Sequence, residues 1–161
     1  MVRPMSVLEN KVFDEIQITD KCYYKKSMTE KELVLFSAAS GDVNPVHLDK
    51  EFAANSVFKE RIAHGMWSAS LVSATLATVM PGPGTIYLSQ SIEFHRPVKL
   101  GDDLEVMLVV KEKNHKKKTV TFLCEVKNQS DKVVASGEAV VIAPTEKIRV
   151  ERPCLPEIFI G

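Results

Sequence analysis

Cysteine is scarce in this sequence, and what there is does not pair. The chain has three cysteines, Cys22, Cys124 and Cys154, and no two of them have the Cys-x-x-Cys spacing. An odd number without close spacing excludes a disulfide framework and a structural zinc site built on cysteines. We therefore expect three reduced thiols, as in a cytoplasmic protein.

The sequence also lacks an excess of charge and any long apolar run. Lysine plus arginine and aspartate plus glutamate each number 21, so the formal net charge is zero. This balance offers no electrostatic reason for a nucleic-acid or anionic-membrane partner. No apolar run approaches the length of a membrane span, and the first ten residues have no apolar segment of a signal peptide. We predict a cytoplasmic protein with neither kind of partner.

What the chain does have suits one globular domain. It has 161 residues, of which 45% are hydrophobic, enough to bury a sizeable core without cross-links. We place a single domain over residues 1–143. The remainder, residues 144–161, has three prolines among charged residues, and we expect an extended tail that does not pack.

Residues 65–80 differ in kind from the rest of the chain, because they carry no charge and their polar members are only serine and threonine. Such side chains can hydrogen-bond within their own helix, so a helix that is apolar or small all round is expected to be buried. At about 1.5 Å per residue it would span roughly 24 Å. The run Pro81-Gly82-Pro83-Gly84 ends it.

After this helix the hydrophobic period changes to two. Four strands are expected, with apolar residues alternating within residues 86–94, 103–110, 120–126 and 133–141. Short separators make the sheet antiparallel. Before the helix we expect a strand at Lys21–Lys26, a helix from about Ser27 to Gly41, and a short helix at Asp49–Ala54. The fold class is α+β: a curved antiparallel sheet wrapped around one long buried helix.

The densest polar cluster is Ser40-Gly41-Asp42-Val43-Asn44-Pro45-Val46-His47. Asp42 and His47 lie five residues apart on a turn stiffened by Pro45, so both side chains can point at one water and move its proton. The alternative is a turn that only ends a helix, with Asp42 bonded to backbone and His47 exposed.

A second cluster, Ala63-His64-Gly65, stands at the start of the long helix. Free N–H groups at a helix N-terminus bind anionic oxygen, and Gly65 has no side chain to block the approach. Alternatively, the glycine only begins a crowded helix. We expect His64 to be structural rather than a second base.

His115 and the run Lys116–Lys118 form a third cluster. Its lysines could meet the phosphates of a nucleotide group. A solvated hairpin turn explains them equally well.

Several segments together resemble the MaoC-like (R)-specific enoyl-CoA hydratases. The likeness covers roughly Met28 to Ala143 and is carried by Ser40–Asp49 with Phe52-Ala53, Ile62–Met66 with Ala69–Ser73, Pro81–Leu88, Phe94–Val98, and Gly101-Asp102. The resemblance implies a hot-dog fold, usually dimeric, and syn hydration of trans-2-enoyl-CoA to (3R)-hydroxyacyl-CoA.

The resemblance also implies roles for individual residues. Asp42 and His47 would be the catalytic pair, and Gly65 would supply the backbone N–H for the thioester oxygen. Asn44 would support the pair, Ser73 would lie near the active site, and both are candidate substrate-binding residues. No metal and no redox cofactor are implied, because coenzyme A is part of the substrate. On the long helix we add Trp67 as a candidate substrate-binding residue because of its size.

Two other functions remain open at this point: a hot-dog acyl-CoA thioesterase and a non-catalytic acyl-CoA-binding module. A homodimer is expected, since a long strand with an unpaired edge is a liability unless it is covered. Residues Pro144–Arg149 weakly resemble the connector that joins such hydratase domains to phosphate acetyl- or butyryltransferases, so the chain could be one module of a bifunctional protein.

Overall fold

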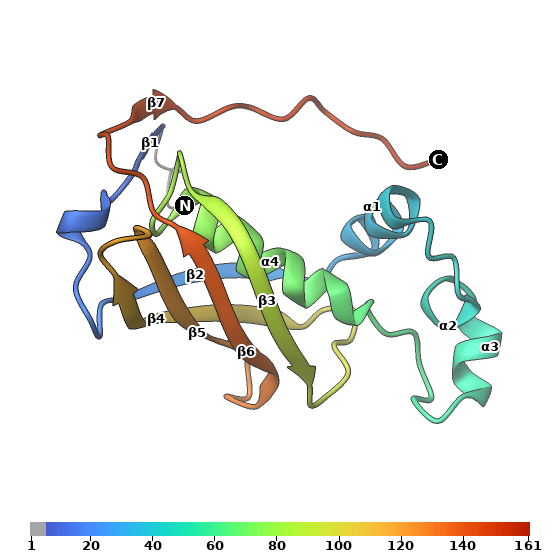
Figure 1. Cartoon of the computed structure of the whole chain (residues 1–161). Coiled ribbons are helices and arrows are strands. Elements are labelled where there is room, and N and C mark those ends of the chain that lie inside the picture. Colours follow the sequence, from blue (N-terminus) through green and yellow to red (C-terminus); the bar gives the residue numbers. More distant parts are fainter. Residues whose placement is uncertain (1–5) are drawn as a thin grey trace.

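A computed structural model describes residues 6–161, and its centre is a curved antiparallel sheet (Figure 1). The sheet has five strands in the order β2-β4-β5-β6-β3. Their bounds are Lys21–Ser27 for β2, Ile86–Phe94 for β3, Asp103–Asn114 for β4, Thr119–Lys127 for β5 and Val133–Ile142 for β6. The sheet curves around the long helix α4, Gly65–Thr78, as expected from the sequence.

The central strands bury alternate residues against α4. On β4 the buried side chains are Leu104, Val106, Leu108 and Val110, and on β5 they are Val120, Phe122, Cys124 and Val126. The period of two predicted this inner face correctly, since successive side chains of a strand point to opposite faces. From α4, the core receives Trp67, Leu71, Val72 and Leu76.

Two expectations about burial were wrong in part: β3 exposes apolar residues, and α4 exposes one of its sides. Strand β3 lies at the edge of the sheet, and its apolar residues Ile86 and Leu88 are 56% and 52% exposed. Helix α4 is not buried all round, because Met66, Ser70 and Ser73 are exposed. The physical reason is shared: a sheet of this width covers only one side of a helix, so the other side and the last strand meet no further layer of this chain.

Three short helices lie beyond one end of α4 (Figure 1). They are α1 (Glu30–Ser40), α2 (Pro45–Leu48) and α3 (Lys50–Asn55). Gly41 ends α1 with φ 78°, a left-handed conformation that glycine adopts without strain. Helix α2 was not expected from the sequence. It exists because the Asn44 side chain caps it and Pro45 occupies its first position.

Part of the segment after residue 144 is paired in a short sheet, which corrects the expectation that none of it packs. Strand β1 (Val7–Glu9) pairs antiparallel with β7 (Arg149–Glu151), and the 3-10 helix η1 (Phe13–Glu15) follows β1. Charged residues flanking the prolines hid this short pairing in the sequence. Residues 153–161 are extended and exposed, as expected.

The cysteines are free, in line with their spacing. Cys22 and Cys124 are buried on the sheet, whereas Cys154 is exposed in the tail. Burial raises the pKa of the Cys22 thiol to about 12 and that of Cys124 to about 11. None of the helices within residues 6–161 is long and apolar enough to cross a membrane.

Candidate active site

Helix α2 carries His47 into the protein interior. The residue is only 7% exposed, and its Nδ1 lies 2.7 Å from the carbonyl oxygen of Ile62. A carbonyl only accepts, so Nδ1 carries the proton and donates it. In the neutral ring, Nε2 is then the acceptor nitrogen, and it faces Asp42. The alternative of an exposed His47 on a plain turn is therefore wrong.

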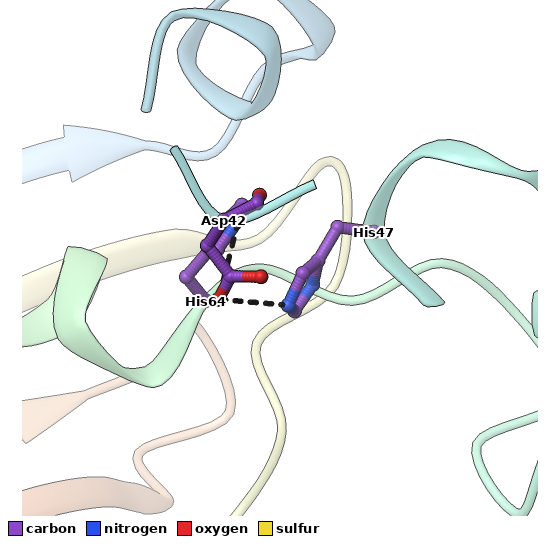
Figure 2. A group of neighbouring side chains, drawn as sticks. All are labelled: Asp42, His47 and His64. Carbon is purple, nitrogen blue, oxygen red and sulfur yellow. Dashed lines mark hydrogen bonds and ion pairs between the residues drawn. The ribbon is translucent and has the colours of Figure 1, made fainter. Parts of the chain in front are cut away.

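Asp42 lies on the irregular stretch that joins α1 to α2, with 52% of its side chain exposed. Its Oδ1 accepts the backbone N–H of Asn44 at 3.1 Å. Its Oδ2 lies 3.9 Å from His47 Nε2, too far for a direct hydrogen bond (Figure 2). A water that bonds both atoms at about 2.8 Å fits this separation. The two side chains thus face one small space, as their spacing predicted.

His64 completes the cluster in Figure 2, and sequence reasoning assigned it only a structural place. It is 3% exposed, and its ring stacks on that of His47 with centroids 3.7 Å apart and an angle of 26° between the planes. Its Nε2 lies 2.9 Å from the backbone oxygen of Asp42, while its Nδ1 is buried without a partner. Nothing in the sequence indicated these contacts, since the residues are 22 positions apart.

Gly65 is the first residue of α4, directly after His64. The backbone N–H groups of a first helical turn have no partner within the helix. A cavity of about 340 Å³ opens beside Gly65, lined also by Ser68, Phe58 and Phe94. A Cβ on Gly65 would come within 3.2 Å of the Phe94 ring. The missing side chain therefore keeps a narrow passage open at the helix N-terminus.

The other predicted site residues lie at different distances from this cluster. Asn44 is exposed between Asp42 and His47, where it accepts the N–H of Val46 at 3.2 Å. Ser73 lies on the uncovered side of α4, eight residues or about 12 Å beyond Gly65. Trp67 is not brought to the cavity: its side chain is 2% exposed in the core, with Nε1 3.3 Å from a Glu32 carboxylate oxygen.

The lysine run lies far from the cluster, at the opposite end of the sheet (Figure 1). There the Nζ of Lys118 lies 4.7 Å from the centre of the Phe13 ring, and His115 meets the same ring edge-on at 5.2 Å. Lys116 and Lys117 are exposed. The structure therefore supports the hairpin-turn interpretation of this run.

Asp42, His47 and His64 also have their ligand atoms within 4.8 Å of one another, close enough to consider a metal ion. Their orientations do not suit one. The two imidazole rings are stacked, so their in-plane lone pairs run nearly side by side and do not converge on one point. In addition, Nε2 of His64 is held by the carbonyl of Asp42. The arrangement suits proton transfer to and from a water better than metal ligation.

Comparisons with known proteins show what this chain is similar to. The family model described as "MaoC like domain" matches residues 14–132. An (R)-specific enoyl-CoA hydratase from Rhodospirillum rubrum is 42% identical over 82% of this chain and 91% of that protein. A 3-hydroxybutyryl-CoA dehydratase from Methylorubrum extorquens is 38% identical over 84% of this chain and 85% of that protein.

A solved structure extends the likeness to the whole fold. An R-hydratase from Pseudomonas aeruginosa in its unliganded form superposes with a TM-score of 0.93 and 53% sequence identity, covering 97% of this chain and all of that one. The hot-dog fold expected from the sequence is confirmed. The matched residues include the Asp42–His47 turn and the start of α4, and the chain belongs to the MaoC-like domain family.

Proposed function

We propose that the protein adds water to trans-2-enoyl-CoA to give (3R)-hydroxyacyl-CoA and catalyses the reverse dehydration. One observation carries this proposal. Asp42 Oδ2 and His47 Nε2 lie 3.9 Å apart, beside the free N–H groups at the start of α4. The hydratase and dehydratase names of the relatives support the same reaction in its two directions.

In the proposed mechanism, the thioester oxygen accepts a hydrogen bond from the Gly65 N–H at the positive end of the α4 dipole. This draws electrons from the double bond and makes C3 electrophilic. Water between Asp42 and His47 forms the bond to C3 while one of the two takes its proton. The π electrons move towards the carbonyl as an enolate, which collects a proton at C2 from the same face. Overall one water is added, with no redox cofactor and no metal.

Two further residues take part in this proposal. Asn44 holds the Asp42 turn through its backbone N–H, so it supports the pair without contacting substrate. Ser73 lies on the uncovered side of α4, where an acyl chain entering past Gly65 would run. Trp67 packs in the core, and it has no place in the proposed substrate contacts.

We further propose that the protein is a homodimer and works in the cytoplasm. The apolar edge strand β3 and the uncharged exposed side of α4 adjoin, and a second copy would cover both. Sedimentation at micromolar concentration tests the dimer, and a species of monomer mass alone would contradict it. A link from residues 144–161 to a transferase domain stays a prediction.

Incubation with crotonyl-CoA tests the reaction against its two rivals. We expect enoyl absorbance to fall without release of free thiol, and chiral analysis to find the (3R) alcohol. Thiol release would indicate the thioesterase, and no change in either signal would indicate a binding module. A (3S) or racemic product would contradict the proposed orientation of substrate on the Asp42 side.

A further inference from the structure

The segment Ile62 to Gly65 contacts both residues of the proposed catalytic pair and includes the proposed oxyanion donor, Gly65. The carbonyl of Ile62 accepts from His47 Nδ1 at 2.7 Å. His64 contacts both Asp42 and His47 (Figure 2). Gly65 offers the N–H for the thioester oxygen. This four-residue segment therefore sets where the base, the water and the oxyanion donor stand relative to one another.

The segment is itself held firmly. The N–H of Ala63 donates to the carbonyl of Val98 at 2.7 Å. Just before it, Arg61 is 8% exposed and binds Glu30 through two hydrogen bonds, of 2.8 and 2.5 Å. This pairing lowers the pKa of the Glu30 carboxyl. The segment is thus a fixed reference against which the Asp42 turn can be placed.

The Asp42 turn has little else to hold it. Its N–H donates to Ser40 Oγ at 3.2 Å, and its Oδ1 accepts from Asn44 at 3.1 Å, both contacts within the turn. Among the hydrogen bonds of residues 6–161, the one from His64 Nε2 to the Asp42 carbonyl is the bond that ties Asp42 to the start of α4. The hydroxyl of Ser37 lies 3.3 Å from the same nitrogen.

His64 also limits the movement of the His47 ring. The stack at 3.7 Å closes one face of that ring, and the Ile62 carbonyl fixes its far edge. A ring held at one edge and on one face keeps Nε2 directed towards Asp42. The Phe36 ring also lies near His64, with the two ring centroids 5.0 Å apart and the planes tilted by 53°.

Packing alone does not explain a histidine here. Its Nδ1 is buried without a hydrogen-bond partner, which costs free energy. A phenylalanine would fill similar space and leave no nitrogen unpaired. The feature that only histidine supplies is the Nε2–H donor combined with a flat ring face.

We propose that His64 is a positioning residue of the hydration site: its Nε2–H and its ring face hold Asp42 and His47 in register with the Gly65 N–H. This proposal rests on the proposed hydratase function. His64 acts through the two other side chains and exchanges no proton with substrate.

Three variants test the Nε2–H hydrogen bond and the ring stacking of His64 separately. His64→Phe keeps a flat ring and loses the donor. His64→Gln places an amide N–H near the position of Nε2, whereas His64→Asn places one near the position of Nδ1, too short to reach Asp42. We expect kcat for crotonyl-CoA hydration to fall about 10- to 100-fold in the Phe and Asn variants, because small misplacements of reacting groups cost that much. KM should change less than threefold. Gln, which keeps the donor and loses the ring face, should have a kcat above those of the Phe and Asn variants and below that of the wild type.

Thermal unfolding of each variant confirms that the protein compared is folded. Wild-type kcat in folded His64→Phe, or equal kcat in the Gln and Asn variants, would overturn the positioning role. Asp42→Asn is measured in parallel to keep the two proposals distinct. If Asp42→Asn is inactive while His64→Phe is normal, the positioning role fails alone. If Asp42→Asn is fully active, the hydratase mechanism fails first.

Discussion

Polar side chains at two opposite ends of this protein are bonded to very different degrees. At one end Asn10, 2% exposed, joins β1 to the chain after β6. Its Nδ2 donates to the carbonyls of Pro83 and Glu146 at 3.1 and 2.9 Å, and its Oδ1 accepts the N–H of Ile148 at 3.0 Å. Each polar atom of this side chain has a protein partner.

At the other end, the cluster of Asp42, His47 and His64 is incompletely bonded. Asp42 Oδ2 has no partner closer than 3.9 Å, and His64 Nδ1 has none. Fully bonded polar networks rigidify a fold, whereas a buried atom without a partner, here His64 Nδ1, costs stability. The half-exposed Asp42 carboxylate is free to bond a water or a ligand. We therefore expect substitutions at Asn10 to lower stability and substitutions at Asp42 to lower turnover. The variants below test each expectation.

The largest effect is expected at the proposed catalytic pair. Asp42→Asn and His47→Ala should each lower turnover of crotonyl-CoA by about two orders of magnitude or more, since a positioned acid–base group is lost. Asp42→Asn should leave stability almost unchanged, because the side chain is half exposed and an amide oxygen can still accept from Asn44. Steady-state kinetics with urea unfolding measures both. Near-normal turnover in either folded variant would contradict the proposed catalytic role of the pair.

Asn10 should show the opposite pattern. Asn10→Ala removes three hydrogen bonds from a buried junction, so the free energy of unfolding should fall by about 2–4 kcal/mol. Turnover per folded molecule should be normal at low temperature. Asn55→Ala is the matched control, because this exposed asparagine makes one bond, to the Glu51 carbonyl, and should cost far less. Equal losses of unfolding free energy in the two variants would contradict the structural role proposed for Asn10.

Gly65→Ala sharpens the comparison within the site. The added methyl would lie 3.2 Å from the Phe94 ring, which is 49% exposed and can turn away. Stability should therefore change by less than about 1 kcal/mol, since alanine favours a helix. Turnover should fall about 10-fold, because the methyl crowds the approach to the oxyanion donor. Ser70→Ala, exposed on the same helix, should leave both unchanged; a similar fall there would point to a general effect on α4.

The smallest effect is expected at the exposed lysines of the far end. Lys116→Ala and Lys117→Ala should each leave kcat/KM for crotonyl-CoA within about twofold of wild type, because isolated surface charges contribute little and these lie far from Gly65. A rise in KM of tenfold would mean that the lysines do meet the phosphates of coenzyme A. The far end would then no longer be only structural.

Much of the fold was predictable from local patterns. The strands β4, β5 and β6 and the helices α1 and α3 follow from alternation, caps and Gly41. The short pairing of β1 with β7 was not, because three-residue strands flanked by charges and prolines give no periodic signal. Helix α2 was missed because a one-turn helix, held by the Asn44 cap and by Pro45 at its first position, gives no periodic signal.

The candidate site also has residues that local sequence patterns predicted and residues that they did not. Asp42, His47 and Gly65 were recognisable from residue type, spacing and family resemblance. Trp67 was misjudged, because a sequence names the members of a helix and not which side of it meets the cavity. Ser73 lies on the exposed side of α4, and its contact with substrate stays a prediction.

The sequence by itself determined where the long helices and the five strands of the main sheet form, and which turn carries the acid and the imidazole, because these follow from neighbours along the chain. Only the tertiary structure decided that α4 keeps one side uncovered, that Trp67 belongs to the core, and that His64 stacks on His47 and bonds the backbone of Asp42. The physical reason is range: periodicity and capping act over a few residues, whereas these contacts join segments that meet only when the sheet has curved around its helix.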